Sequence, residues 1–348
     1  MMSITNTKYP LISSGAFFIG LMLFVLTSSC KKGLPADRES IGLDTRFTQS
    51  VYSPVLGRNT LFSDNLFIGA SSQPLNFKII NMRTRDGSPA PELTNNTPVQ
   101  VWRQPYLGTE KSIEEIEAKR KMENRPLFEI REHSGQFLMW SAATSTLLKT
   151  QPDSGYVFDV EMSNSGGRRY FRDLKLMPLK ERPFEPSVLD PITGLSRFLG
   201  LTPSSISNIR GAKTNQRLFY NDITVLFNKV NGGGNSLKFR FVDSLFKPID
   251  PNSFNLTKWD QLVHGFNMVK TNESVKYDVA YPIPLVDFQT PYTNPQGNRA
   301  HTLFRYERQG FGNVREEAYL SIDFSIYEKG NWEIIIWFTG ESPKFTND

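Results

Sequence analysis

Apolar and polar residues alternate along much of this chain with the two-residue period of a β-strand. The clearest case is the run 319–327, in which every second residue is apolar: Leu320, Ile322, Phe324 and Ile326. The run 156–162 alternates in the same way. Successive side chains of a strand point to opposite faces, so each run predicts a strand with one face in a core. The run 332–338 is almost wholly apolar and predicts a strand buried on both faces.

Turn-forming residues separate pairs of such runs and predict hairpins. The pair Ser134–Gly135 separates the β-prone runs 127–133 and 136–142, and a Ser-Asn-Ser-Gly-Gly stretch separates 156–162 from 169–176. Glycine and short polar side chains tolerate the backbone conformations that tight turns require. We therefore expect two hairpins in the first half of the chain.

These features predict a mostly β protein with two β-sandwich-like domains, immunoglobulin-like or jelly-roll in type, and one short helical insertion. A length of 348 residues suits two cores better than one. Prolines recur between 178 and 216, and we interpret this stretch as a stiff linker. The expected parts are a signal peptide (1–29), a lipidated cysteine with its tether (30–50), an N-terminal sandwich (51–177), the Pro-rich linker and a C-terminal sandwich (217–348).

One stretch of the first predicted domain has helical rather than strand character. Ser112 followed by Glu115 matches a capping box, and the residues from Ile113 to Asn124 are rich in helix formers. Glu115 and Glu117 each precede a lysine by four residues, a spacing that supports a helix. Its apolar stripe is thin, so we interpret it as a solvated insertion. A helix that docks a partner is the alternative.

The first thirty residues have the pattern of an export signal. A charged start with Lys8 precedes an apolar run from Leu11 to Leu26, which is shorter than the ~20 residues of a permanent membrane span. Small residues follow, and then comes Cys30, the only cysteine of the chain. The stretch Leu-Thr-Ser-Ser-Cys resembles a bacterial lipobox, in which the cysteine is acylated and becomes the new N-terminus. This resemblance predicts an outer-membrane lipid anchor through Cys30, facing the periplasm or the cell surface.

Composition and motif spacing exclude several kinds of chemistry. With Cys30 lipidated, no thiol remains for disulfides, cysteine–zinc sites or cysteine nucleophiles. The net charge of +5 is spread along the chain without a dense basic block, so we expect no nucleic-acid partner. The three histidines are far apart in sequence, and we expect neither a metal site nor a cofactor. No Gly-x-Ser-x-Gly motif is present, and we expect no enzyme activity.

Aromatic residues in polar surroundings are the best candidates for ligand binding. Trp102 precedes a Pro-Tyr turn, Trp259 lies among polar residues, and Tyr292 lies in a stretch without core spacing. A flat ring presents an apolar face to sugar C–H groups while neighbouring polar side chains bond hydroxyls. The alternative for each of the three is a partly buried packing ring.

Several stretches resemble one known family. They are Pro-Asp-Ser-Gly-Tyr-Val-Phe-Asp-Val at 152–160, Ser-Asn-Ser-Gly-Gly-Arg-Arg-Tyr-Phe at 163–171, Asn-Leu-Thr-Lys-Trp-Asp at 255–260, Leu-Val-His-Gly-Phe-Asn at 262–267 and Tyr-Asp-Val-Ala-Tyr-Pro-Ile-Pro-Leu at 277–285. Together with the lipobox and the closing run 332–338, they resemble an uncharacterised lipoprotein family of Bacteroidota, a domain of unknown function. The resemblance implies a setting beside the outer-membrane machinery that captures and imports polysaccharide. It implies no catalytic or binding residue.

The sequence thus predicts a membrane-anchored, non-enzymatic accessory lipoprotein that binds a glycan or glycopeptide beside an outer-membrane uptake system. Two alternatives stay open. One is an assembly lipoprotein that docks an outer-membrane protein partner such as a transporter component. The other is a glycoside hydrolase with an unrecognised carboxylate pair, since the separation of such a pair is a property of the fold.

The lipid anchor is tested by substitution of the acylated residue. Cys30→Ala removes the thiol to which the lipid is attached, so we expect the variant to accumulate as unlipidated precursor. Metabolic labelling with a fatty-acid analogue measures this directly. Labelling of the variant at the wild-type level would contradict the assignment.

Overall fold

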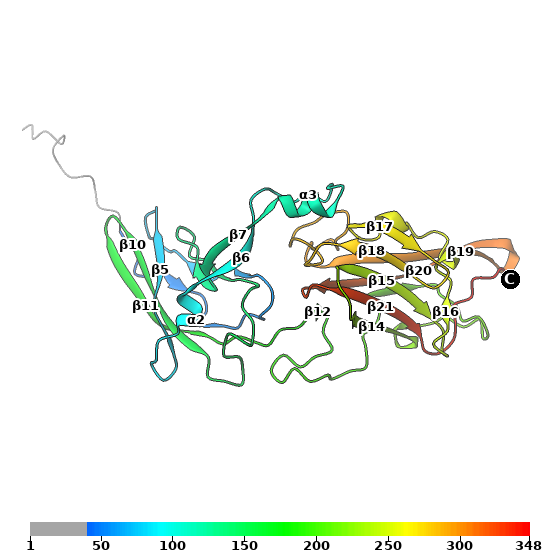
Figure 1. Ribbon diagram of the computed structural model, residues 1–348, viewed down its shortest axis with the longest axis horizontal. Coiled ribbons are helices and arrows are strands. Elements are labelled where there is room, and N and C mark those ends of the chain that lie inside the picture. The colour runs from blue at the N-terminus through cyan, green and yellow to red at the C-terminus, as the bar shows by residue number, and fades with distance from the viewer. Residues whose placement is uncertain (1–39) are drawn as a thin grey trace, which may run out of the picture.

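The computed structural model describes residues 40–348 (Figure 1). The predicted signal peptide and the lipidation residue Cys30 lie outside the described residues. The described chain forms two β-rich lobes side by side along the long axis of the molecule (Figure 1). We call residues 40–177 the N-terminal lobe and residues 178–348 the C-terminal lobe. The predicted mostly β fold with two β-sandwich regions is confirmed.

Two small sheets enclose the core of the N-terminal lobe. One has the order β2-β11-β10-β5 and the other the order β3-β9-β8. Their strands are β2 (Val51–Tyr52), β5 (Asn76–Thr84), β10 (Tyr156–Asn164), β11 (Gly167–Leu176), β3 (Thr60–Phe62), β8 (Phe128–Ile130) and β9 (Phe137–Met139). A two-stranded sheet pairs β1 (Arg46–Phe47) with β4 (Leu66–Phe67), and α2 (Pro91–Thr94) is a single turn. Aromatic rings fill the space between the sheets: Phe137 contacts Tyr52 at 4.6 Å and Phe158 at 5.3 Å between ring centroids.

Both predicted hairpins are confirmed in this lobe. Strands β8 and β9 pair antiparallel around the Ser134–Gly135 turn, where Gly135 has a φ of +71° that suits glycine. Strands β10 and β11 pair from Tyr156 opposite Leu176 to Asn164 opposite Gly167.

The C-terminal lobe is a larger sandwich of two facing sheets. One sheet has the order β14-β21-β15-β18-β17, with β16 paired to β15; the other has the order β12-β20-β13, with β19 paired to β20. The strands are β12 (Phe184–Glu185), β13 (Ser205–Ser207), β14 (Ile223–Val230), β15 (Ser236–Val242), β16 (Pro248–Ile249), β17 (Gly265–Lys270), β18 (Val275–Val279), β19 (Ala300–Gly310), β20 (Val314–Ile326) and β21 (Asn331–Phe338). Four 3₁₀ turns complete the lobe: η2 (Tyr220–Asp222), η3 (Pro251–Ser253), η4 (Trp259–Gln261) and η5 (Phe311–Asn313).

The apolar run 332–338 forms an interior strand of its sheet, in keeping with the burial on both faces that its pattern predicted. Strand β21 pairs antiparallel with β14 and parallel with β15, and therefore lies between two strands that are close in sequence. Ile334, Ile335 and Ile336 are all buried. Facing rings from the two sheets, such as Phe241 and Phe304 at 5.0 Å, fill the interior of the sandwich.

The Pro-rich stretch 178–216, predicted as a linker, instead supplies edge strands to the C-terminal sandwich. Within it, β12 and β13 both pair with β20, and Ile209 is fully buried in the core. Proline lacks an N–H donor but keeps its carbonyl acceptor, and the Pro183 carbonyl accepts from the Tyr327 N–H at 2.8 Å. Short pairings of this kind give no periodic signal in the sequence.

The predicted helix Ile113–Asn124 is only half as long as its composition indicated. Helix α3 spans Ile113–Ala118, and its predicted cap is confirmed because the Ser112 hydroxyl accepts from the Glu115 N–H at 3.2 Å. The chain then continues as β7 (Arg120–Pro126), which pairs with β6 (Asn96–Trp102) along its full length. Strand pairing in the tertiary structure therefore overrides helix propensity here. Within the described residues, no helix has the length and apolar character of a membrane span.

The sandwich core makes a direct prediction for stability. Phe304 is fully buried between the sheets, so Phe304→Ala is expected to lower the free energy of unfolding by about 3–5 kcal/mol. Phe311→Ala is the matched control, because that ring is 91% exposed and its removal should change stability by less than about 0.5 kcal/mol. Denaturant unfolding of both variants measures the difference. Equal stability of the two would contradict the described core.

Candidate functional site

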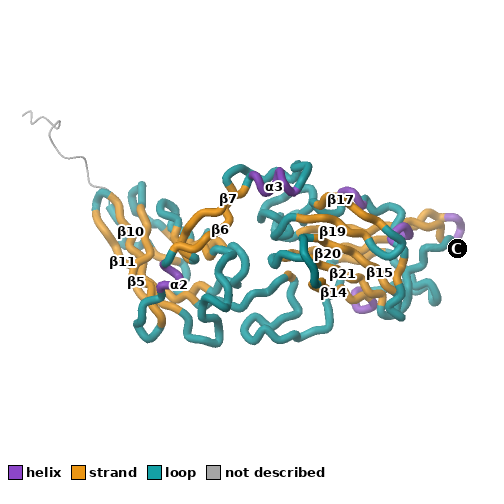
Figure 2. Tube along the Cα trace, viewed as in Figure 1, coloured by secondary structure: helices purple, strands orange, loops and turns teal. Residues whose placement is uncertain are grey.

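A long excursion of the N-terminal lobe reaches across to the C-terminal lobe. We call residues 96–126 the arm; it comprises β6, the following loop, α3 and β7. Figure 2 shows α3 above the junction of the lobes, beside loops of the C-terminal lobe. Tyr106 and Ile116 of the arm pack with Ala280 and Leu285 in one buried apolar cluster. The arm therefore attaches the lobes by a contact that is independent of the covalent connection.

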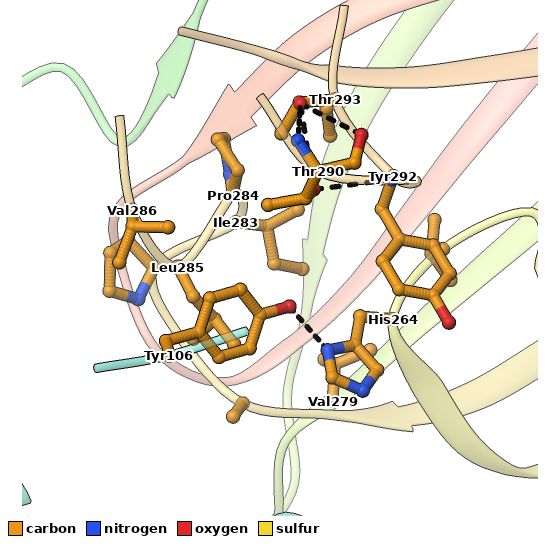
Figure 3. Close-up of a pocket in the computed structure, with 14 residues that line it drawn as sticks. Tyr106, His264, Val279, Ile283, Pro284, Leu285, Val286, Thr290, Tyr292 and Thr293 are labelled. Atoms are coloured by element: carbon orange, nitrogen blue, oxygen red, sulfur yellow. Dashed lines mark hydrogen bonds between the residues drawn. The ribbon is translucent and has the colours of Figure 1, made fainter. Parts of the chain in front are cut away.

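His264 lies at the centre of this attachment and bonds the arm through both ring nitrogens. Its Nε2 lies 2.9 Å from the Glu110 carbonyl oxygen, and its Nδ1 contacts the Tyr106 hydroxyl (Figure 3). A carbonyl only accepts hydrogen bonds, so Nε2 carries the proton and Nδ1 accepts from Tyr106. Burial raises the pKa of Tyr106 well above its ordinary value, which keeps the hydroxyl protonated and able to donate.

Tyr292 completes this cluster. Its ring stacks on His264 with centroids 4.8 Å apart and planes 7° apart. The space left between these rings and the 282–286 segment is about 20 Å³, which is room for one water molecule. A space of this size is too small for an organic ligand, so these rings form a packed joint between the lobes.

Glu110 holds the loop of the arm in shape. Its buried carboxylate accepts from the Leu107 and Thr109 N–H groups at 2.9 and 3.0 Å and forms an ion pair with Lys119. Burial by itself raises the pKa of this carboxyl. The lysine and the N–H donors outweigh burial and lower the pKa to about 2.

Arg120 fixes the end of the arm beside the same segment of the C-terminal lobe. Its guanidinium lies over the Trp102 ring at 4.3 Å and donates to the Tyr281 carbonyl at 2.8 Å and to Glu117 at 3.0 Å. Its side chain is only 3% exposed, and burial lowers its pKa. Its Nη2 has no hydrogen-bond partner among the described residues.

A larger cavity of about 300 Å³ lies next to this joint, between the two lobes. Trp102, Tyr281 and Tyr327 are the aromatic residues of its lining, and the two cavities share residues of the 282–286 segment. The polar lining comes from both lobes and consists of Arg58, Asn59, Gln100, Arg120, Ser141, Asp287 and Lys329. Its volume is at the lower end of the range for small-molecule sites, ~300–1,000 Å³.

Charges line this cavity unevenly. Arg58 pairs with Glu185 at 2.9 Å and lies over the Tyr327 ring at 4.5 Å, so it too links the lobes. Among the described residues, Asp287 is the only one that contributes a carboxylate to the lining. The Asp287 side chain is in contact with solvent. Removal of part of its water shell by the surrounding protein raises the pKa of its carboxyl, and the charge of Arg58 opposes that rise. A facing carboxylate pair of the kind used in glycoside hydrolysis is therefore not present at this cavity.

The structure places the three predicted aromatic residues in different settings. Trp102 is half-buried and lines the cavity, and Tyr292 belongs to the adjacent joint. Trp259 lies on η4 with 7% exposure and packs edge-on against Phe241 at 6.2 Å, so its ring is a core residue rather than a platform. The polar residues around Trp259 in sequence face solvent while the indole points inward.

Sequence reasoning did not find the basic and aromatic partners of Trp102. Arg120 belonged to the predicted helix, and nothing in its local sequence indicated a stacked, buried guanidinium. Tyr327 is the last residue of the clearest predicted strand. Its role at the cavity follows from a contact with Arg58 of the other lobe, which a local sequence pattern does not predict. Among the described residues, no group of three His, Cys, Asp or Glu side chains has metal-binding geometry.

Comparison with known sequences gives a family assignment. The sequence model of a family described as Domain of unknown function (DUF5007) matches residues 66–347. The chain belongs to this family. The DUF5007 match includes the arm and all cavity-lining residues other than Gly57, Arg58 and Asn59. No curated protein and no solved structure matches the chain significantly.

The Glu110 carboxylate gives a pH-dependent prediction. Its folded-state pKa of about 2 lies below the ordinary 4.5, so its contribution to stability is present above pH 4.5 and is lost as the pH falls toward 2. Glu110→Gln is expected to lower the free energy of unfolding at pH 7 by about 1–3 kcal/mol, with a smaller difference at pH 3. Denaturant unfolding at both pH values measures this.

Glu273→Gln is the matched control, because the Glu273 side chain is exposed on a turn of the C-terminal lobe. It should unfold like the wild type at both pH values. If Glu110→Gln lowers the free energy of unfolding by the same amount at pH 7 and pH 3, the charge of the carboxylate does not stabilise the arm.

Proposed function

We propose that this DUF5007 protein is a non-enzymatic, lipid-anchored accessory protein that binds a glycan in the cavity between its lobes. The observation that supports this proposal is the composition of the cavity. Rings of Trp102 and Tyr327 lie beside amide, hydroxyl, guanidinium and carboxylate groups in one concave space. The setting we propose is the outer membrane, beside a polysaccharide uptake system, with the chain anchored through Cys30.

The chemistry of a sugar fits such a lining. A pyranose ring has apolar C–H faces and a rim of hydroxyls that both donate and accept hydrogen bonds. Indole and phenol rings cover the faces, and the side chains of Asn59, Gln100 and Ser141 both donate and accept. Asp287 adds an acceptor, and the guanidinium groups add donors only.

The lining is also held in place before any ligand arrives. Arg58 is fixed by Glu185 and by the Tyr327 ring, and Arg120 by Trp102 and the Tyr281 carbonyl. Side chains that are already ordered lose little rotamer entropy on binding, which favours affinity for a small polar ligand.

A second candidate function, docking of an outer-membrane protein partner, is favoured by one feature of the surface. Leu195, Phe198 and Leu199 are 70%, 64% and 78% exposed on a single loop of the C-terminal lobe. Exposed apolar side chains that gather on one loop are typical of protein contact sites. The third alternative, a glycoside hydrolase, has no carboxylate pair at the interlobe cavity to support it.

Glycan-array binding by the full chain tests the proposal. Trp102→Ala removes the ring that covers the sugar face, and we expect the array signal to fall at least tenfold, since a buried aromatic contact contributes about 1.5–3 kcal/mol. Tyr170→Ala is the control, because that ring is half-exposed on β11 outside the cavity.

Because Trp102 also supports Arg120, a second variant keeps the test independent of folding. Asp287→Asn preserves shape at an exposed side chain and should alter which glycans bind without changing thermal stability. An array blank for the wild type across plant, host and microbial glycans would refute glycan binding and favour the docking alternative.

A further inference from the structure

A second concave surface lies on the C-terminal lobe and has a volume of about 440 Å³. We call it the Tyr292 groove, because Tyr292 lines both this groove and the small joint below His264. In Figure 3 the Tyr292 hydroxyl points away from Tyr106. The apolar part of the groove is completed by Leu256, Leu262 and Leu303.

One wall of the groove is built from alternate residues of β19. His301, Leu303 and Arg305 are two residues apart, so their side chains point to the same face of the strand. The opposite wall is the 256–262 segment, and Thr257 anchors it to β19. The Thr257 hydroxyl donates to the Arg305 carbonyl at 3.1 Å and accepts from the Arg305 N–H at 2.8 Å. The two walls are therefore fixed relative to each other.

Cationic and donor groups gather on the rim, and no carboxylate from residues 40–348 lines the groove. Lys258 is exposed and forms no ion pair with any described residue. Arg305 bonds Glu317 through both its Nε, at 2.7 Å, and its Nη2, and only its Nη1 is left without a partner among the described residues. Asp260 lies close enough to add to the effect of burial in raising the pKa of Tyr292, but it is not part of the lining.

His301 adds a third directed group. Its Nδ1 lies 2.6 Å from the Asp323 carboxylate across the β19–β20 pair, which orients the ring. A carboxylate only accepts, so Nδ1 carries the proton and Nε2 is left without a partner among the described residues. The groove therefore combines an apolar floor with an ammonium, a guanidinium and an imidazole at its edge.

We infer that the Tyr292 groove binds a carboxylate-bearing sugar unit. The inference rests on the proposed glycan-binding function and extends it to a second site and a substrate class. The leucine and tyrosine surface covers a sugar face, and Lys258 and Arg305 take the carboxylate, since guanidinium and ammonium donors bond carboxylates more strongly than neutral hydroxyls. Attraction between such exposed charges weakens as salt rises.

The test is a binding titration of the full chain with uronic-acid oligosaccharides and with the same oligosaccharides after reduction of their carboxyl groups. The acidic probes are oligogalacturonate, oligoalginate and hyaluronan fragments. We expect at least one acidic probe to bind at least tenfold more tightly than its reduced counterpart, with weaker binding at high salt. Lys258→Glu should weaken that acidic probe at least tenfold and leave the reduced one unchanged.

Lys276→Glu is the matched control, because it makes the same charge reversal at an exposed lysine of β18 outside both sites and should change the binding of neither probe. Lys329→Glu makes the reversal at an exposed lysine of the interlobe cavity and so distinguishes the two sites. If Lys329→Glu weakens the acidic probe and Lys258→Glu does not, the acidic unit binds in the cavity and the groove assignment is wrong. If only neutral glycans bind, the inference fails while the proposed function stands. Binding of no glycan on the array defeats both.

Discussion

The contact between the arm and His264 holds the arm against the C-terminal lobe, and the wall that the arm gives to the interlobe cavity depends on it. The half-buried imidazole bonds Tyr106 and a backbone carbonyl, so both of its nitrogens are satisfied, and an apolar cluster lies beside it. Glu110 shapes the loop that presents these partners. Together with the bond from Arg120 to the Tyr281 carbonyl, this contact places Trp102 against the 281–287 segment, where the arm forms one wall of the cavity.

Local patterns in the sequence predicted where strands form but not which strands pair with each other. The alternation at 319–327 and the apolar run 332–338 report the faces that each strand buries, and these are local properties. That β21 lies between β14 and β15 is a pairing across about a hundred residues, which no local period encodes. The helix prediction was too long beyond Ala118 for the same reason, because the pairing of β7 with β6 outweighs its helix formers.

The candidate site was accessible to sequence reasoning only in part. Trp102 stood out because an aromatic ring beside polar residues is unusual in a core. The same criterion selected Trp259, whose polar neighbours face solvent while the ring points inward. Arg58 becomes recognisable only when the lobes meet, and Arg120 only when β7 pairs with β6 and sets it opposite Trp102, since each matters through the ring it covers. The family stretches at 262–267 and 277–285 converge at the joint, which gives these resembling segments a shared structural position.

The contact of Arg58 with the C-terminal lobe has a mechanical consequence. The arm attaches the lobes on one side of the cavity, and Arg58 attaches them on another through Glu185 and Tyr327. With the covalent connection, this makes a closed linkage rather than a single hinge, so rotation of one lobe strains two distant contacts together. Any molecule that contacts both lobes in the cavity adds a further connection between them. Its binding energy and the rigidity of the junction are then thermodynamically coupled, each strengthening the other by the same amount.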